Sequence, residues 1–233
     1  TEAGVISGAV TYSSTCSSTT VAGTYSKAIT PVTTGLTISS MGKDGTTPNY
    51  KFSVANGTVT INRKAITLTG VTASDRTYNA AKTAVLAAAN PSCAQLDFET
   101  ATYSNGVLTI PVTGLNLNGT DDVNNLSYKI TVTGVYASGD AGENIAVTLT
   151  GTLDTELAKR YTLNALGSAN ANINKAVLTV TCVNKSVVYG SAAPSYTVSY
   201  SGFVGTQTTA VLTTVPKATC NEYSGTSPFT SVG

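Results

Sequence analysis

The sequence predicts an all-β fold, mostly antiparallel, made of tandem small β-sandwich or β-grasp-like modules with at most one or two short helical turns. Three observations support this class. Apolar and polar residues alternate over several short segments that are rich in β-branched residues. Charged residues make up only 11% of the 233 residues, and Thr, Ser, Gly and Asn supply the polar surface instead. In addition, one phrase of the sequence occurs twice, which indicates a repeated module.

The alternating segments are expected to form half-buried strands. In SYKITVTGVY, residues 127–136, the side chains of Tyr128, Ile130 and Val132 would share one face, and polar side chains would occupy the other. Gly, Asn and Pro separate this segment from its neighbours and predict turns between the strands. The other predicted strands are 48–54, 106–112, 145–151, 176–183 and 194–200.

Two segments favour a helix over a strand. NAAKTAVLAAANP, residues 79–91, is rich in Ala and ends at Asn90-Pro91, where a helix would be expected to stop. TLDTELAKR, residues 152–160, is long enough for a single helical turn. Neither segment changes the predicted class.

The repeated phrase predicts the domain organisation. Lys64-Ala65 and Lys175-Ala176 lie 111 residues apart, and Tyr78 and Tyr189 each follow the lysine by 14 residues. The segments before them, NYKFSVANGTVTINRKA and RYTLNALGSANANINKA, also correspond. We interpret the phrases as module boundaries, with no loose linker between modules, so that the array is elongated and semi-stiff. The expected parts are 1–63, the C-terminal part of one module, 64–174, a complete central module, and 175–233, the N-terminal part of a further module.

The last of these parts resembles the opening of the MBG domain, a module of large bacterial surface proteins. The residues that carry the resemblance occur in the order Tyr189-Gly190, Pro194, Ser201-Gly202-Phe203 and Ala210-Val211-Leu212. The closing part of that domain resembles the first part of the chain, through Gly23-Thr24-Tyr25, Asn49-Tyr50, Phe52 and Asn56-Gly57-Thr58.

The central part resembles the YDG-type repeat of similar proteins, with Tyr78-Asn79-Ala80 where that repeat has Tyr-Asp-Gly. Together the resemblances imply a secreted or cell-surface bacterial protein of adhesin-like architecture, and they carry over no catalytic residue. They also imply that residues 79–86 are extended, against the Ala-based helix prediction, and that residues 205–212 hold a short helical turn.

Composition excludes several functions. The chain has no His, which removes Ser-His-Asp and Cys-His nucleophilic sites in their usual form and the commonest metal ligand. A net charge of +1 without a basic run gives no footprint for nucleic acid. No stretch approaches the roughly 18 apolar residues that a membrane span needs. We therefore expect no enzyme activity, no cofactor, no metal and no membrane insertion.

The cysteines and acidic residues offer few candidates. Cys16, Cys93, Cys182 and Cys220 form no CxxC pair. Cys182 and Cys220 are the candidate structural disulfide, while the partners of Cys16 and Cys93 stay open. The remaining candidates are interpreted as ordinary strand, turn and surface residues: a carboxylate pair at Asp97 and Glu99, calcium ligands at Asp121, Asp122, Asn124, Asp140 and Glu143, and isopeptide lysines at Lys64 and Lys175.

Two functions remain in view. The first is a non-catalytic stalk, spacer or protein-interaction segment at the bacterial cell surface, with an unidentified protein or glycan as its ligand. The alternative is a carbohydrate-binding module, but Trp is absent, and Tyr196 and Tyr200 share a face with Val198, which favours packing over sugar stacking. We also expect the incomplete parts, 17–63 and 175–233, to pair between neighbouring molecules.

Overall fold

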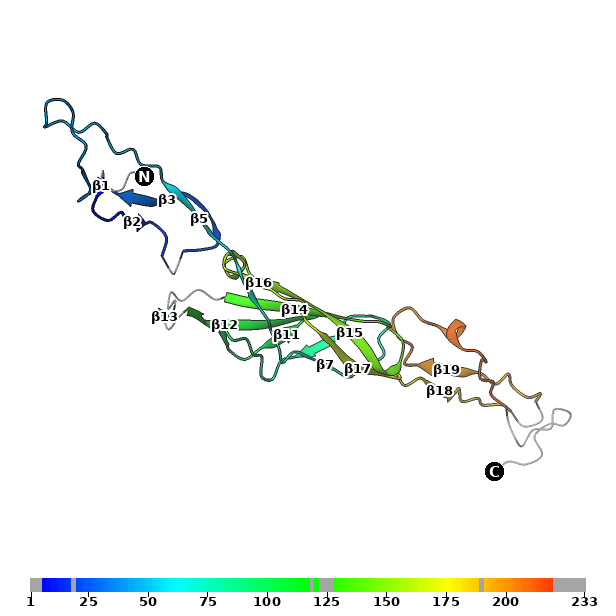
Figure 1. Cartoon of the computed structure of the whole chain (residues 1–233). Coiled ribbons are helices and arrows are strands. Elements are labelled where there is room, and N and C mark those ends of the chain that lie inside the picture. The colour runs from blue at the N-terminus through cyan, green and yellow to red at the C-terminus, as the bar shows by residue number, and fades with distance from the viewer. Residues whose placement is uncertain (1–5, 18–19, 118–119, 122–127, 189–190, 220–233) are drawn as a thin grey trace. The chain divides into compact units, whose positions relative to one another are not determined.

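The computed structural model describes residues 6–17, 20–117, 120–121, 128–188 and 191–219 (Figure 1). It confirms the all-β, mostly antiparallel class, because nearly every regular element is a strand and most strand pairs are antiparallel. The chain divides into two compact units. The first contains 1–71, 88–132 and 150–166, and the second contains 72–87, 133–149 and 167–233.

The first unit begins with short strands that bury little. β3 is the middle strand of a three-stranded antiparallel sheet, β2-β3-β5, and β1 pairs with β4 (Figure 1). Ala28, on β3, is the only buried apolar residue among the described residues before position 64. The bounds are β1 Ile6–Ser7, β2 Thr11–Ser14, β3 Gly23–Val32, β4 Thr37–Ile38 and β5 Gly57–Ile61.

The rest of the first unit contains a tight hairpin and a parallel pair. Ser104 pairs with Val107 across Asn105 and Gly106, which both have positive φ, as a two-residue hairpin turn of Asn-Gly requires. The 3-10 turn η1 confirms the short helical turn predicted in 152–160. The bounds are β6 Lys64–Ile66, β10 Leu96–Phe98, β11 Thr102–Ser104, β12 Val107–Leu117, β13 Thr120–Asp121, η1 Leu157–Lys159 and β16 Tyr161–Leu163, with β6 and β16 parallel.

The second unit contains β7 and β9, which pair with each other, β17, which pairs with β8 in parallel, and the β18·β19 pair. The 3-10 turn η2 lies in the segment 205–212, as the family resemblance implied. β14 and β15 contribute residues to both units, and the largest sheet has the order β10-β12-β14-β15-β17-β8. The bounds are β7 Thr72–Ser74, β8 Arg76–Thr77, β9 Val85–Ala87, β14 Tyr128–Tyr136, β15 Gly142–Leu153, β17 Ser168–Asn174, β18 Thr179–Cys182, β19 Val198–Ser201 and η2 Thr209–Val211.

The core lies between residues 64 and 174. β14 shows the predicted alternation, since Tyr128, Ile130 and Val132 are all buried while Lys129 is exposed. With the exception of Ala28, every described apolar residue that is buried falls in this range, and none lies after it. The largest fully buried side chains are Tyr136, Tyr161, Ile66, Leu86, Leu108, Ile110, Ile130, Leu157, Ile173, Val132 and Val147.

The helix predicted for 79–91 is wrong. The segment is extended and contains β9, as the family resemblance implied. The Ala84 amide donates to the Gly134 carbonyl (2.9 Å), and the Tyr136 amide donates to the Lys82 carbonyl (2.8 Å). Ala84 and Leu86 are thereby buried against β14, so pairing with a neighbouring strand outweighs the helix propensity of Ala.

The strand predicted at 48–54 is also wrong. The segment makes one isolated bridge, Met41 with Pro48, and residues 49–56 belong to no strand. Its apolar side chains, Tyr50, Phe52 and Val54, are exposed. The alternation is present in the sequence, but among the described residues no neighbouring strand covers it. Two other predicted strands are shorter than expected, 179–182 within 176–183 and 198–201 at the end of 194–200.

Candidate functional site

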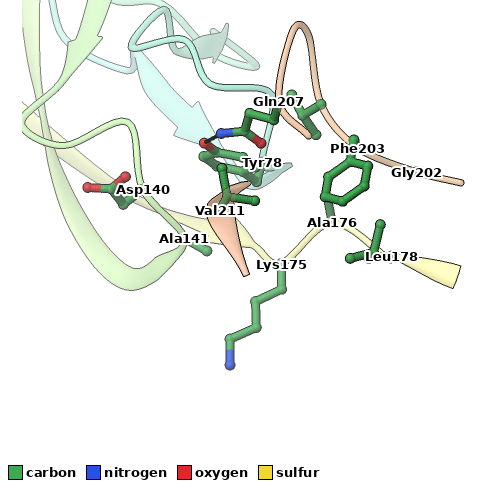
Figure 2. Close-up of a pocket in the computed structure, with 11 residues that line it drawn as sticks. Tyr78, Asp140, Ala141, Lys175, Ala176, Leu178, Gly202, Phe203, Gln207 and Val211 are labelled. Atoms are coloured by element: carbon green, nitrogen blue, oxygen red, sulfur yellow. Dashed lines mark hydrogen bonds between the residues drawn. The ribbon is translucent and has the colours of Figure 1, made fainter. Parts of the chain in front are cut away.

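A groove of about 390 Å³ lies in the second unit, beside the second copy of the repeated phrase (Figure 2). One wall comes from the residue after β8 and from the turn before β15, and the other from the chain between Lys175 and η2. Most of the wall is apolar. The lining residues are Tyr78, Asp140, Ala141, Lys175, Ala176, Leu178, Gly202, Phe203, Val204, Gln207 and Val211.

A hydrogen bond joins the two walls. The Gln207 side-chain amide donates to the Tyr78 hydroxyl at 2.7 Å, across 129 positions of sequence. Tyr78 is held by its own backbone, since its amide donates to the Asn174 carbonyl at the end of β17 (2.8 Å). The backbone amide of Gln207 donates to the Val204 carbonyl (3.1 Å) in a tight turn. Both partners are therefore placed by short, hydrogen-bonded segments.

Gly202 allows the chain to approach closely here. Its φ is +102°, and a Cβ at this position would lie 2.2 Å from the Val177 carbonyl oxygen. Any other residue would have to move the strand away, because such contacts do not occur. The close approach sets Phe203 on the groove wall, where its ring lies 5.9 Å from that of Tyr200 in a tilted arrangement.

The charged residues of the groove do not converge on its centre. Asp140 is tied to its own turn, where its carboxylate accepts from the Ser138 hydroxyl (2.9 Å). Lys175 extends away from the aromatic residues (Figure 2). The groove thus combines an aromatic and aliphatic surface with a neutral amide–hydroxyl pair, which suits stacking and hydrogen bonding to an uncharged ligand.

A second pocket, of about 510 Å³, lies in the first unit and is more polar. Asp97 and Glu99 line it, together with Cys93. Leu96 is buried, Asp97 exposed, Phe98 half-buried and Glu99 exposed, which agrees with a strand whose alternate faces are polar and apolar. The two carboxylates therefore lie on the outer face of β10 and its continuation.

The calcium candidates fall in two places. Asp122 and Asn124 lie outside the described residues, and β13 ends at Asp121. Asp140 and Glu143 are exposed. Within the part of the chain that the structure describes, no three acidic or cysteine side chains gather as metal ligands would.

The disulfide between Cys182 and Cys220 stays a prediction. Cys182 is exposed on β18, and Cys220 lies outside the described residues. Cys16 and Cys93 are half-buried. The isopeptide candidates Lys64 and Lys175 are both exposed.

Comparison with known families identifies the C-terminal segment. Residues 178–231 match the family model of the MBG domain (YGX type), which confirms the MBG resemblance predicted for the last part of the chain. Six groove residues, from Leu178 to Val211, lie inside this match. No curated protein and no solved structure matches the chain. The family is a non-catalytic, repeat-type family, and the match is consistent with a repeat module of a bacterial surface protein.

Among the described residues, no helix has the length and apolar character to cross a bilayer. The sequence pointed to parts of the groove without assembling it. Tyr78 closes the first repeated phrase, and Gly202-Phe203 belongs to the MBG motif. Gln207 carried no signal, because its role depends on a contact 129 residues away.

Proposed function

We propose that the chain is a non-catalytic repeat segment of a bacterial cell-surface or secreted adhesin-like protein, serving as a stalk or as a protein-interaction surface. One observation supports this proposal above the others. The MBG-matched segment begins four residues after β17 ends, and the Gln207–Tyr78 hydrogen bond joins it to the residue after β8. A module that is attached without a linker and fastened by a side-chain bond suits a spacer that holds its length.

Small-angle scattering tests the spacer function. A Gly-Ser insertion between Asn174 and Lys175 separates the two walls of the groove and should loosen the junction. We expect the unmodified chain to scatter as a stiff, elongated particle and the insertion variant to show a broader distribution of distances. An insertion of the same length between Gly45 and Thr46, in an exposed turn, is the matched control. Identical profiles for the unmodified chain and the junction variant would contradict the proposal.

A second candidate, carbohydrate binding, is supported by the groove itself. Phe203 offers a ring for stacking and Gln207 offers an amide, the two groups with which sugars are commonly held. A glycan array would decide. Reproducible binding that Phe203→Ala abolishes, while the exposed control Tyr12→Ala retains it, would favour the glycan function. An array without hits, together with an elongated scattering profile, would favour the spacer.

A further inference from the structure

The exposed apolar side chains are concentrated in the two flanking parts. Of the fifteen large apolar side chains that are exposed among the described residues, seven precede position 64, seven follow position 174, and only Val135 lies between. The 111-residue repeat aligns residues of the flanking parts with residues of the central part, 64–174. In the central part, neighbouring strands cover the positions that are exposed in the flanks.

In the central part, the opening strand pairs with the closing strand. β6 and β16 are parallel, with Lys64 opposite Tyr161 and Ile66 opposite Leu163. The pair continues at both ends, since the Lys64 amide donates to the Arg160 carbonyl (2.9 Å) and the Asn164 amide to the Ile66 carbonyl (2.8 Å). Tyr161 and Ile66 are consequently 2% and 1% exposed.

The repeat gives these positions counterparts in the flanking parts. A shift of 111 residues places Tyr50 and Phe52 at the positions of Tyr161 and Leu163, and Val177 at the position of Ile66. Neither counterpart segment is a strand, and Tyr50 is 61% and Val177 80% exposed. The residues that form the first parallel pair of the central part are thus present but unpaired in the flanks.

A second parallel pair repeats the same relation. In the central part, Ile173 of β17 lies opposite Arg76 of β8, and both are buried. The INRKA and INKA phrases align Ile173 with Ile61, and the 111-residue shift aligns Arg76 with Val187. Ile61 is half-buried and Val187 is exposed.

We propose that residues 50–61 of one copy pair in parallel with residues 175–188 of a second copy of this chain. At the start the register is that of the central part, with Tyr50 opposite Lys175, Lys51 opposite Ala176 and Phe52 opposite Val177. Because 50–61 is one residue shorter than its counterpart 161–173, a single-residue bulge in the 178–186 segment brings Ile61 opposite Val187. This register opposes no two charges and places Phe52 on Val177 as Leu163 lies on Ile66. Each copy offers one segment at each flank, so the pairing runs head to tail. The proposal stands on the repeat and the exposed residues, and does not depend on the proposed function.

Register-specific crosslinking tests this pairing. Two variants, Phe52→Cys and Val177→Cys, are purified separately, mixed under mild oxidation and analysed by peptide mapping for a bond between the introduced thiols. We expect that bond to form, because in-register neighbours bring their Cα atoms within disulfide range. The matched control replaces the first variant by Lys51→Cys, whose side chain points to the opposite face of the strand. No bond between Phe52→Cys and Val177→Cys, or an equal yield from the control mixture, would overturn the proposal.

Sedimentation velocity of the chain without added cysteines provides an independent readout. Association should increase with concentration, and Val177→Lys should weaken it by about tenfold or more, because it removes an apolar contact and introduces a buried charge. Val177 is so exposed that this change leaves the fold of the free chain intact. A species that stays monomeric at every concentration, with the bond formed inside the double variant Phe52→Cys/Val177→Cys, would assign the pairing to one chain and overturn the second-copy proposal.

Discussion

Arg76 shows how one buried cation organises the second unit. Its guanidinium donates to the Thr77 carbonyl (3.1 Å), to the Asn79 side chain and to the Ala81 carbonyl. It also lies over the Tyr136 ring, with its central carbon 4.9 Å from the ring centroid. The planar fork of an arginine makes all of these contacts at once, which a lysine could not do. Arg76 therefore fixes the turn that leads from β8 into the extended 79–87 segment.

Arg76→Met should destabilise the chain by about 2 kcal/mol, because it leaves buried carbonyl oxygens without a donor, although relief of the buried charge offsets part of the loss. Urea unfolding would measure the change in the free energy of unfolding. Arg63→Met, at an exposed position, is the matched control and should shift it by less than about 0.5 kcal/mol. Equal effects of the two substitutions would show that Arg76 carries no special structural role.

Asp44 provides a prediction about pH. The pKa of its carboxyl group is lowered to about 2, chiefly because the Thr47 hydroxyl donates to it, and also because the Thr47 and Thr46 amides do so. The folded pKa lies below the value of 3.8 in the unfolded chain, so the stabilisation of this turn is present above pH 3.8 and is lost as the pH falls through about 2. An NMR titration of the carboxyl carbon should therefore have its midpoint near 2.

The cause of that shift can be tested separately. Thr47→Val removes the hydroxyl but keeps both amide donors, and we expect the midpoint of Asp44 to rise toward 3.8. Thr46→Val, which keeps the hydroxyl of Thr47, is the comparison and should raise it less. If both variants titrated as the unmodified chain does, the hydroxyl would not be the main cause.

Among the single elements, the 79–91 segment is extended because of the strand beside it and against its own Ala-rich composition. Ala84 and Leu86, which are 0% and 2% exposed, fill the space beside β14. Gly134 on β14 makes that space available, because a Cβ there would lie 2.8 Å from Leu86 Cδ2 and 3.1 Å from both Ala84 Cβ and Val147 Cγ1.

Gly134→Ala should therefore destabilise the chain by about 1–3 kcal/mol, as overpacking does in a filled core. Thermal unfolding would reveal a lower Tm. Gly167→Ala is the matched control, since a Cβ at Gly167 meets nothing within 4 Å and its φ is not positive, so that substitution should be neutral or slightly stabilising. A Gly134→Ala variant as stable as the control would mean that β9 and β14 are less closely packed than described.

In the molecule as a whole, the Gln207–Tyr78 hydrogen bond spans the boundary predicted between residues 174 and 175. Tyr78→Phe removes the acceptor for Gln207 while keeping the ring in the groove. We expect the backbone amides of 207–212 to exchange with deuterium about five times faster, as the loss of about 1 kcal/mol from local opening implies. Amides of β14 should be unaffected.

Tyr12→Phe is the matched control for that experiment, because Tyr12 is exposed and far from the groove in sequence. It should change no exchange rate in 207–212. Faster exchange spread over both units would indicate global destabilisation and would contradict a local fastening role for Tyr78.

The β class, strands at 106–112, 127–136 and 145–151, the short helical turns and the repeated phrase were all predictable from the sequence. The structure has the corresponding strands at 107–117, 128–136 and 142–153. The sequence also identified the MBG segment through Tyr189-Gly190 and Ser201-Gly202-Phe203. These features were accessible because alternation, turn residues and motifs are properties of a short stretch of chain. The sequence did not assemble the groove, since its two walls meet only in the folded chain.

Which alternating segments find a partner strand depends on the folded chain. Residues 161–163 form a strand with Tyr161 buried because Lys64–Ile66 lies alongside in parallel, whereas the equivalent 50–52 is exposed and forms no strand. Pairing with β14 likewise keeps the Ala-rich 79–91 segment extended beside Gly134. The hydrogen bond between Gln207 and Tyr78 also depends on residues that meet only in the folded chain. The physical reason is that a strand is stabilised by hydrogen bonds and apolar contacts to a neighbour, and no local pattern states whether that neighbour is present.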